Sequence, residues 1–354
     1  MNNCTFPWTG MVINPQGYIT LCCIQDNSSK FTGLHISKVN NLIDYFNGKE
    51  YNAIRQEFEE KGWQNISECF ICKNMVNKEI WSQYNASQQF DPSFNKLQYL
   101  EFTTSNVCNQ MCATCCSQFS NQWTLENEIK FGRTMSDKRH ILSDKDINKI
   151  CESLTDLKEL NIKGGEPFAD IRNYKVIKKL FEVNDECKIT IVTNGSLIPE
   201  RYMDLIFKNP KRFFISVSID AIGKRYEWIR STPWEKTDNT LKELYYQTGV
   251  KADMNPVLSI YNAAHLSDIL NYIKESEYIR KYKSTISKLC SNQVYNPAWA
   301  NVECVFTQEQ IDSIQKPFAL KSRFNKKHYK DSIKYTQVMN KIRGFDMDIW
   351  NDMG

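Results

Sequence analysis

The stretch that decides the fold reads Cys-Asn-Gln-Met-Cys-Ala-Thr-Cys at residues 108–115, directly after an apolar segment at 97–104. Its cysteines, Cys108, Cys112 and Cys115, have the spacing C-x3-C-x2-C. Three thiolates on one short loop can converge on one soft metal centre. A structural zinc site takes four ligands, whereas three ligands to a four-iron cluster leave one iron open to bind a substrate or cofactor. Cys116 would be a fourth thiolate, but two adjacent cysteines rarely bind one ion comfortably.

The sequence on either side of this loop alternates between strand and helix patterns. The expected strands are 97–104, 158–163, 188–193, 212–219, 251–259 and 284–291. The expected helices between them include 174–183, 200–207, 237–246 and 264–273. Such a series predicts a parallel sheet with right-handed crossovers, either an open sheet or a partial barrel.

Polar residues on one face of several strands favour the barrel. In the segment 213–220, the apolar residues are Phe213, Ile215, Val217 and Ile219, and the polar residues on the opposite face are Ser216, Ser218 and Asp220. In the same way, Leu160 and Ile162 alternate with Asn161 and Lys163. A parallel strand covered by helices on both sides should be apolar on both faces. We therefore expect an α/β fold, a partial (β/α)6 TIM-like barrel with a polar lumen and its site at the C-terminal strand ends.

Further motifs follow the next strands in order. Gly164-Gly165-Glu166-Pro167 follows the second strand, Thr193-Asn194-Gly195 the third, and Ser218-Ile219-Asp220 closes the fourth, with Arg230 twelve residues after Ser218. Together with the cysteine loop, these motifs resemble the radical S-adenosylmethionine (radical SAM) superfamily over residues 97–292. Thr114 stands where that family usually has an aromatic residue.

The resemblance implies a radical SAM enzyme with a [4Fe-4S] cluster on Cys108, Cys112 and Cys115 and with S-adenosyl-L-methionine (SAM) on its open iron. Glu166 would accept a hydrogen bond from the SAM amino group, and Arg230 would bind the SAM carboxylate with Ser218 beside it. Gly164 and Gly165 would let the backbone approach the ligand closely. Asn194 and Asp220 would reach the ribose or adenine. The sequence does not identify a catalytic acid, base or hydrogen donor, nor the oligomeric state.

The first 90 residues carry a second cysteine group. Cys4 and Cys22 frame Gly17 as C-x12-G-x4-C, and Cys69-Phe70-Ile71-Cys72 adds a C-x2-C pair around a helical middle at 39–61. Four thiolates would saturate one zinc or one iron–sulfur cluster. The spacing resembles the SPASM/twitch auxiliary-cluster domain, here placed ahead of the barrel instead of after it. The resemblance implies a second [4Fe-4S] cluster, with Cys22 favoured over Cys23 as the ligand.

Composition limits the other function classes. Of 354 residues, 41% are hydrophobic and the net charge is only +4, which makes no case for a dedicated nucleic-acid or membrane-surface protein. No apolar run has the length of a spanning helix and no signal peptide is evident, so we expect a soluble cytoplasmic protein. We expect domains at 1–90 (auxiliary cluster), 91–295 (barrel) and 296–354 (a helical C-terminal extension).

Charge is unevenly distributed, because residues 316–343 hold nine Lys or Arg and one acid. This segment is either a solvated helix face or a guide for an anionic partner. The remaining cysteines (Cys151, Cys187, Cys290 and Cys304) are expected to be small buried hydrophobes, although Cys290 and Cys304 could also be thiols of the late barrel.

Three functions remain open. The first is hydrogen abstraction from a peptide or protein by a 5′-deoxyadenosyl radical, with the auxiliary cluster assisting and a flavodoxin- or ferredoxin-like protein as electron donor. The second is the same chemistry on a sugar, nucleotide or other small metabolite, which the basic segment would fit if the metabolite is anionic. The third is a non-catalytic iron–sulfur or zinc-binding interaction protein.

Overall fold

The structure, a computed structural model, describes residues 3–24, 29–76, 83–123, 141–281, 294, 297–314 and 320–349. They divide into two compact units, which are described separately. One contains the described residues of 1–107, 138–192 and 211–214, and the other those of 108–137, 193–210 and 215–354. No helix in the described part of the chain is long and apolar enough to cross a bilayer.

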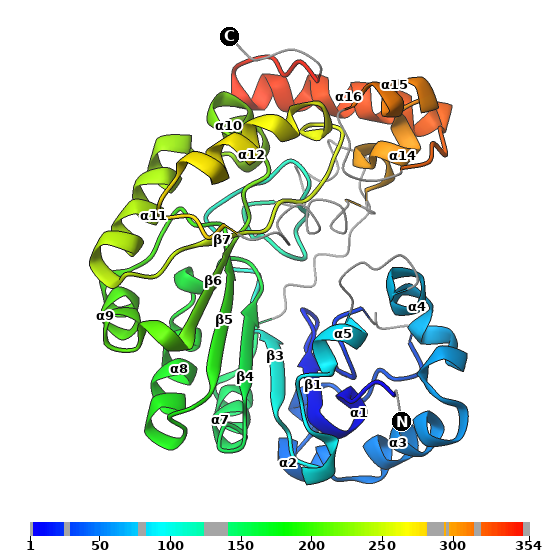
Figure 1. The fold of residues 1–354 in the computed structure, drawn as a ribbon, viewed down its shortest axis with the longest axis vertical. Helices are drawn as coiled ribbons and strands as arrows, with labels where there is room; N and C mark the ends of the chain where they lie inside the picture. The colour runs from blue at the N-terminus through cyan, green and yellow to red at the C-terminus, as the bar shows by residue number, and fades with distance from the viewer. Residues whose placement is uncertain are drawn as a thin grey trace. The chain divides into compact units, whose positions relative to one another are not determined.

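The first unit is built on a sheet with strands in the order β2–β1–β3–β4–β5, of which Figure 1 labels β1, β3, β4 and β5. These strands are β1 (Gly10–Ile13), β2 (Ile19–Thr20), β3 (Tyr99–Thr103), β4 (Glu159–Lys163) and β5 (Lys188–Thr193). All neighbours pair in parallel except β1 and β2, which form an antiparallel pair. The second unit contains most of β6 (Phe213–Val217), which pairs in parallel with the short β7 (Asp253–Met254).

Helices alternate with the strands along the chain. In the first unit, α7 (Asp144–Glu152) begins with a capping box between Ser143 and Asp146, and α8 (Ile171–Val183) begins at Asp170, whose side chain accepts the Arg172 N–H. Each cap satisfies backbone donors that a first turn leaves unpaired. The second unit contains α9 (Glu200–Lys208), α10 (Gly223–Arg230), α11 (Trp234–Thr248), α12 (Leu266–Glu275), α14 (Val302–Val305), α15 (Gln308–Ser313) and α16 (Lys326–Arg343).

The expected α/β fold with parallel strands and a cysteine-rich N-terminal region is confirmed. The expected strands at 97–104, 158–163, 188–193 and 212–219 contain β3 to β6. The expected strand at 251–259 is much longer than β7, which has two residues, and the expected strand at 284–291 lies outside the described residues, as does Cys290. In β4 the expected alternation holds: Leu160 and Ile162 are buried, while Asn161 and Lys163 are partly exposed.

The N-terminal region differs from a simple helical linker between two cysteine pairs. Its helical middle is two helices, α2 (Leu42–Phe46) and α3 (Lys49–Lys61), separated at Gly48, with α4 (Phe70–Val76) and α5 (Gln83–Ser87) after them. It also contributes β1 and β2, which the sequence did not predict. Because β1 pairs with β3, one sheet contains strands from both sides of the boundary that the sequence predicted at residue 90. The domain boundaries at 90 and 295 stay predictions.

Candidate functional site

The cysteine loop begins five residues after β3. Burial raises the pKa of the Cys115 thiol well above its ordinary value, and the nearby Cys112, Cys116 and Cys108 raise it further. Because charges affect one another in this way only at short range, these four sulfurs share one environment. The donor set therefore fits an iron–sulfur cluster on the three spaced cysteines, with Cys116 close by.

The loop is held from several sides by its backbone. The Ala113 N–H donates to the Ile229 carbonyl at 2.7 Å, and the Met111 N–H donates to the Ser231 hydroxyl at 2.8 Å. Ile229 lies near the end of α10, and Ser231, just beyond it, has a left-handed backbone with φ of 57°. Trp123 donates its indole N–H to the Cys112 carbonyl at 3.2 Å. These hydrogen bonds hold the backbone of the loop at Met111, Cys112 and Ala113.

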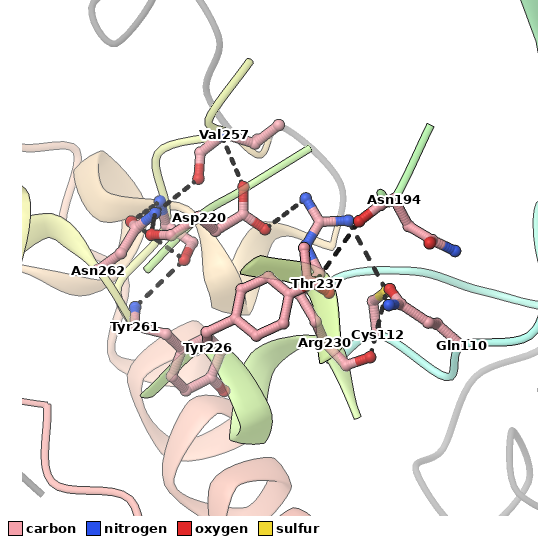
Figure 2. Close-up of polar contacts among 11 residues, drawn as sticks. Gln110, Cys112, Asn194, Asp220, Tyr226, Arg230, Thr237, Val257, Tyr261 and Asn262 are labelled. Carbon is pink, nitrogen blue, oxygen red and sulfur yellow. Dashed lines mark hydrogen bonds and ion pairs between the residues drawn. The ribbon is translucent and has the colours of Figure 1, made fainter. Parts of the chain in front are cut away.

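Arg230 links the cysteine loop to Asp220, which lies three residues after β6, as Figure 2 shows. Its Nη2 lies 2.6 Å from Oδ2 of Asp220, and its Nη1 donates to Sγ of Cys112 at 3.7 Å. Burial alone would lower the pKa of Arg230, but Asp220, Cys112 and Tyr226 together outweigh burial and the pKa is raised. Arg230 therefore keeps its positive charge beside the cysteine loop.

The arginine also has a donor to spare. Its Nε is buried and has no hydrogen-bond partner among the described residues. Such a donor calls for an acceptor, because an unsatisfied buried N–H is costly. The carboxylate of SAM supplies one, so Arg230 fits its predicted role.

Asp220 is fully engaged by the protein itself. Its Oδ2 pairs with Arg230, its Oδ1 accepts the Val257 N–H at 2.8 Å, and its main-chain carbonyl accepts from Nδ2 of Asn262 at 2.8 Å. In this arrangement Asp220 positions Arg230. Its predicted contact with ribose or adenine stays a prediction.

Asn194 fixes the loop from the end of β5. Its Nδ2 donates to Oδ1 of Asn109 at 2.7 Å, while its Oδ1 accepts from the Ser196 N–H and hydroxyl at 2.9 and 2.7 Å. Nδ2 of Asn109 in turn donates to the Ser196 hydroxyl at 2.9 Å, which closes a ring of hydrogen bonds. The half-buried Ser218 donates its N–H to the Thr193 carbonyl at 2.9 Å.

The glycine pair after β4 packs so closely against residues 105–107, which lead into the cysteine loop, that there is no room for a side chain. Gly164 has φ of 137°, and a Cβ on Gly165 would lie 2.2 Å from the Val107 carbonyl oxygen. The Gly165 N–H donates to the Ser105 carbonyl at 3.1 Å, and the buried Glu166 donates its N–H to the Val107 carbonyl at 2.7 Å. The glycines therefore allow two backbone segments to approach each other closely. From the sequence, we expected them to let the backbone approach a bound ligand instead. Glu166 also accepts the Phe168 N–H through Oε1 at 3.1 Å.

The four predicted auxiliary cysteines line one cavity of the first unit. Cys4, Cys22, Cys69 and Cys72 line it together with apolar side chains that include Phe6 and Trp63. Cys23 is exposed and is not among the lining residues, and the preference for Cys22 as the ligand stays a prediction.

The donor set of this cavity fits a cluster with four thiolate ligands. Burial raises the pKa of Cys4 to about 11, so binding a metal there would release a proton. Within the described residues no three His, Cys, Asp or Glu side chains form a ready site for a single metal ion. The ligand roles of all seven cysteines therefore stay predictions.

Two groups of residues were missed by the sequence analysis. Tyr335 of α16 donates its hydroxyl to the Ala113 carbonyl at 2.6 Å, and Arg343 of the same helix donates to the Met111 carbonyl. In the first unit, Nζ of Lys163 lies 2.8 Å from Oε2 of Glu101. Alternation in β4 had marked Lys163 as polar, but no spacing signal identified its partner or the contacts of α16.

Comparison with known proteins agrees with this geometry. Residues 102–273 match the family model of the radical SAM superfamily, and residues 4–73 match that of the SPASM iron–sulfur cluster-binding domain. The chain therefore contains a radical SAM domain. More particularly, its SPASM domain precedes the radical SAM domain, which confirms the expected permuted order.

Individual relatives are distant. The radical SAM cyclopropyl synthase TigE of Paramaledivibacter caminithermalis is 25% identical over 223 residues, which are 59% of this chain and 44% of TigE. A GTP 3′,8-cyclase of Helicobacter pylori is 25% identical over 211 residues, 55% of this chain and 60% of the cyclase. The chain thus spans about half the length of these relatives. A solved structure of anSMEcpe with bound AdoMet and a peptide has a TM-score of 0.42 at 16% identity, covering 70% of this chain and 62% of that one.

Proposed function

We propose that this protein abstracts hydrogen from a peptide or protein substrate by radical SAM chemistry. The radical SAM domain implies a SAM-binding [4Fe-4S] cluster and SAM, and the SPASM domain implies further iron–sulfur chemistry. When bound, the first cluster supplies the electron that splits SAM into methionine and a 5′-deoxyadenosyl radical. The observation that carries the proposal is the Cys108/Cys112/Cys115 loop with the charged Arg230 against it.

The residues of the chain have distinct tasks in this reaction. Cys108, Cys112 and Cys115 would hold the cluster, and Arg230 would bind the SAM carboxylate through its spare Nε–H. Asp220 would keep the guanidinium oriented before SAM arrives, so that little ordering remains to be done on binding. The Cys4/Cys22/Cys69/Cys72 cavity would hold a second [4Fe-4S] cluster that accepts an electron from the substrate radical.

The charge on the polar strand face supports a peptide over a nucleotide. In the first unit this face carries the carboxyl groups of Glu101 and Glu159 and the ammonium groups of Lys163 and Lys188, and Glu101 pairs with Lys163 at 2.8 Å. Tyr99 donates to Oε2 of Glu101 at 2.7 Å, and Asn161 donates to the Tyr99 hydroxyl at 3.2 Å. A face with hydrogen-bonding groups and no excess of positive charge suits amides or cationic side chains better than a triphosphate.

The second candidate, a nucleotide or other metabolite, is favoured by the GTP 3′,8-cyclases among the relatives. It requires cations that face the substrate, and Lys163 already has an acidic partner.

Parallel incubations with the two kinds of substrate distinguish the two candidates. The reconstituted protein, with SAM and dithionite, is incubated anaerobically with short peptides encoded beside its gene or with GTP, and products are identified by mass. We expect a mass change in a peptide, with 5′-deoxyadenosine formed in proportion. A product from GTP and none from any peptide would contradict the proposal.

A further inference from the structure

The C-terminal helix α16 has two faces of opposite character. Its buried face carries Ser332, Tyr335, Thr336 and Met339. Its exposed face carries five lysines, namely Lys326, Lys327, Lys330, Lys334 and Lys341. Tyr329 and Ile333 lie among these lysines with 42% and 43% of their surface exposed. Asn325 caps the start of the helix, and Gly344, whose backbone is left-handed, caps its end.

The buried face is fastened to the loop of the three cysteines, which belongs to the same unit. The Tyr335 hydroxyl donates at 2.6 Å to the carbonyl of Ala113, the residue directly after Cys112. Arg343 donates to the Met111 carbonyl, directly before Cys112, and also to the Trp228 carbonyl at 2.9 Å. A helix with its side chains is about 10–12 Å across, so the exposed lysines lie on the order of 10 Å from this loop.

The lysines of the exposed face have no ion-pair partner among the described residues. Arg323, which precedes the helix, is by contrast paired, since its Nη2 lies 2.8 Å from Oε2 of Glu303. Five unpaired ammonium groups around Tyr329 and Ile333 form a small apolar centre with a basic rim. Weak encounters between redox proteins use small interfaces of this kind, and complementary charge speeds their association.

We propose that the exposed face of α16 is the docking surface for an acidic one-electron carrier protein of the flavodoxin type. This inference rests on the proposed function, because the cluster held by Cys108, Cys112 and Cys115 must be reduced before SAM is cleaved. The flavin hydroquinone of the carrier gives up one electron and becomes a semiquinone, and the cluster gains that electron. The short connection runs through Tyr335 and the Ala113 carbonyl to the backbone next to Cys112.

An acidic peptide substrate is the competing occupant, and the geometry disfavours it. Hydrogen abstraction requires the reacting atoms to approach within about 3–3.5 Å. A molecule on the exposed face of α16 is separated from the cysteine loop by the width of the helix. An electron can cross that distance, whereas a hydrogen atom cannot.

The test uses the reconstituted holoenzyme with two reductants. The variant Lys330→Glu with Lys334→Glu reverses charge on the docking face, and Lys178→Glu with Lys208→Glu makes the same change on exposed residues of α8 and α9. Cluster bleaching is followed by anaerobic stopped flow at low salt, with reduced flavodoxin or with dithionite. We expect the α16 variant to lose at least about tenfold in rate with flavodoxin, because steering contributes 10- to 1,000-fold. Its rate with dithionite, and both rates of the control, should match wild type.

Other outcomes overturn the inference. An unchanged flavodoxin rate, or an equal loss in the control variant, would exclude α16 as the docking face. A loss with dithionite would mean that the lysines act on the cluster itself, and an effect confined to turnover of an acidic peptide would assign the face to the substrate. The proposed function fails separately, if the wild type forms no 5′-deoxyadenosine with either reductant.

Discussion

Replacing Asp220 by Asn tests the ion pair that orients Arg230. The substitution keeps the shape of the side chain and an oxygen for the Val257 N–H, but it removes the negative charge 2.6 Å from the guanidinium. Only 11% of the Arg230 side chain and 2% of the Asp220 side chain are exposed, so water cannot replace the lost partner.

The magnitude follows from this burial. Removing one partner of a buried pair costs about 3–5 kcal/mol, because a charge stays behind uncompensated. With an unfolding entropy of about 2.1 cal/mol/K per residue, 1 kcal/mol corresponds to about 1.3 °C of melting temperature in a chain of 354 residues, so Asp220→Asn should lower the midpoint by at least about 4 °C. The affinity for SAM should fall as well, because the guanidinium is no longer held in place.

The assay is thermal unfolding of the anaerobic protein by circular dichroism, together with SAM binding by calorimetry. Lys179→Met is the control, since it breaks an exposed pair with Glu182 at 3.0 Å and should change stability by under about 1 kcal/mol. A loss below about 1 kcal/mol for Asp220→Asn, or one equal to that of the control, would refute the reasoning.

Three further predictions concern the cysteines, the glycine pair and acid stability. Iron analysis should give about eight irons per chain, falling to about four in Cys22→Ala but not in Cys23→Ala; equal losses in both variants would reject Cys22 as the ligand. Gly165→Ala should abolish SAM binding, measured by calorimetry, because its methyl group would lie 2.2 Å from the Val107 carbonyl; wild-type affinity would mean that the backbone yields freely. Burial raises the pKa of Asp170, but its hydrogen bonds outweigh burial and the pKa is lowered. Its stabilising effect is therefore complete above about pH 4 and is lost as the pH falls through the folded pKa. In urea unfolding of the metal-free chain, Asp170→Asn should be less stable at pH 7 by about 1.5–3 kcal/mol and equal to wild type in strong acid; a gap independent of pH would contradict this.

Much of the fold could be predicted because local patterning agrees with tertiary packing. Alternation in β4 placed Leu160 and Ile162 in the core and left Lys163 on the polar face. The pair β1 and β2 escaped prediction, because the four residues of β1 are all buried and show no alternation, and β2 has only two residues. Short buried strands depend on their pairing partners, which the local sequence does not show.

The candidate site was predictable to the extent that its chemistry lies in linear spacing. The C-x3-C-x2-C loop and the Gly164-Gly165-Glu166 motif could be read directly from the sequence. The pairing of Asp220 with Arg230 and the contact of Tyr335 with Ala113 could not, because they join residues 10 and 222 positions apart through folding alone.

The central claim is that the Cys108/Cys112/Cys115 loop carries a cluster that cleaves SAM, and formation of 5′-deoxyadenosine measures this most directly. The anaerobically reconstituted protein is reduced with dithionite, mixed with SAM and analysed by chromatography and mass spectrometry, beside Cys112→Ala. The account predicts 5′-deoxyadenosine and methionine from the wild type and none from the variant. A wild-type protein with its iron intact that forms neither product, or a variant that forms both at the wild-type rate, would contradict it.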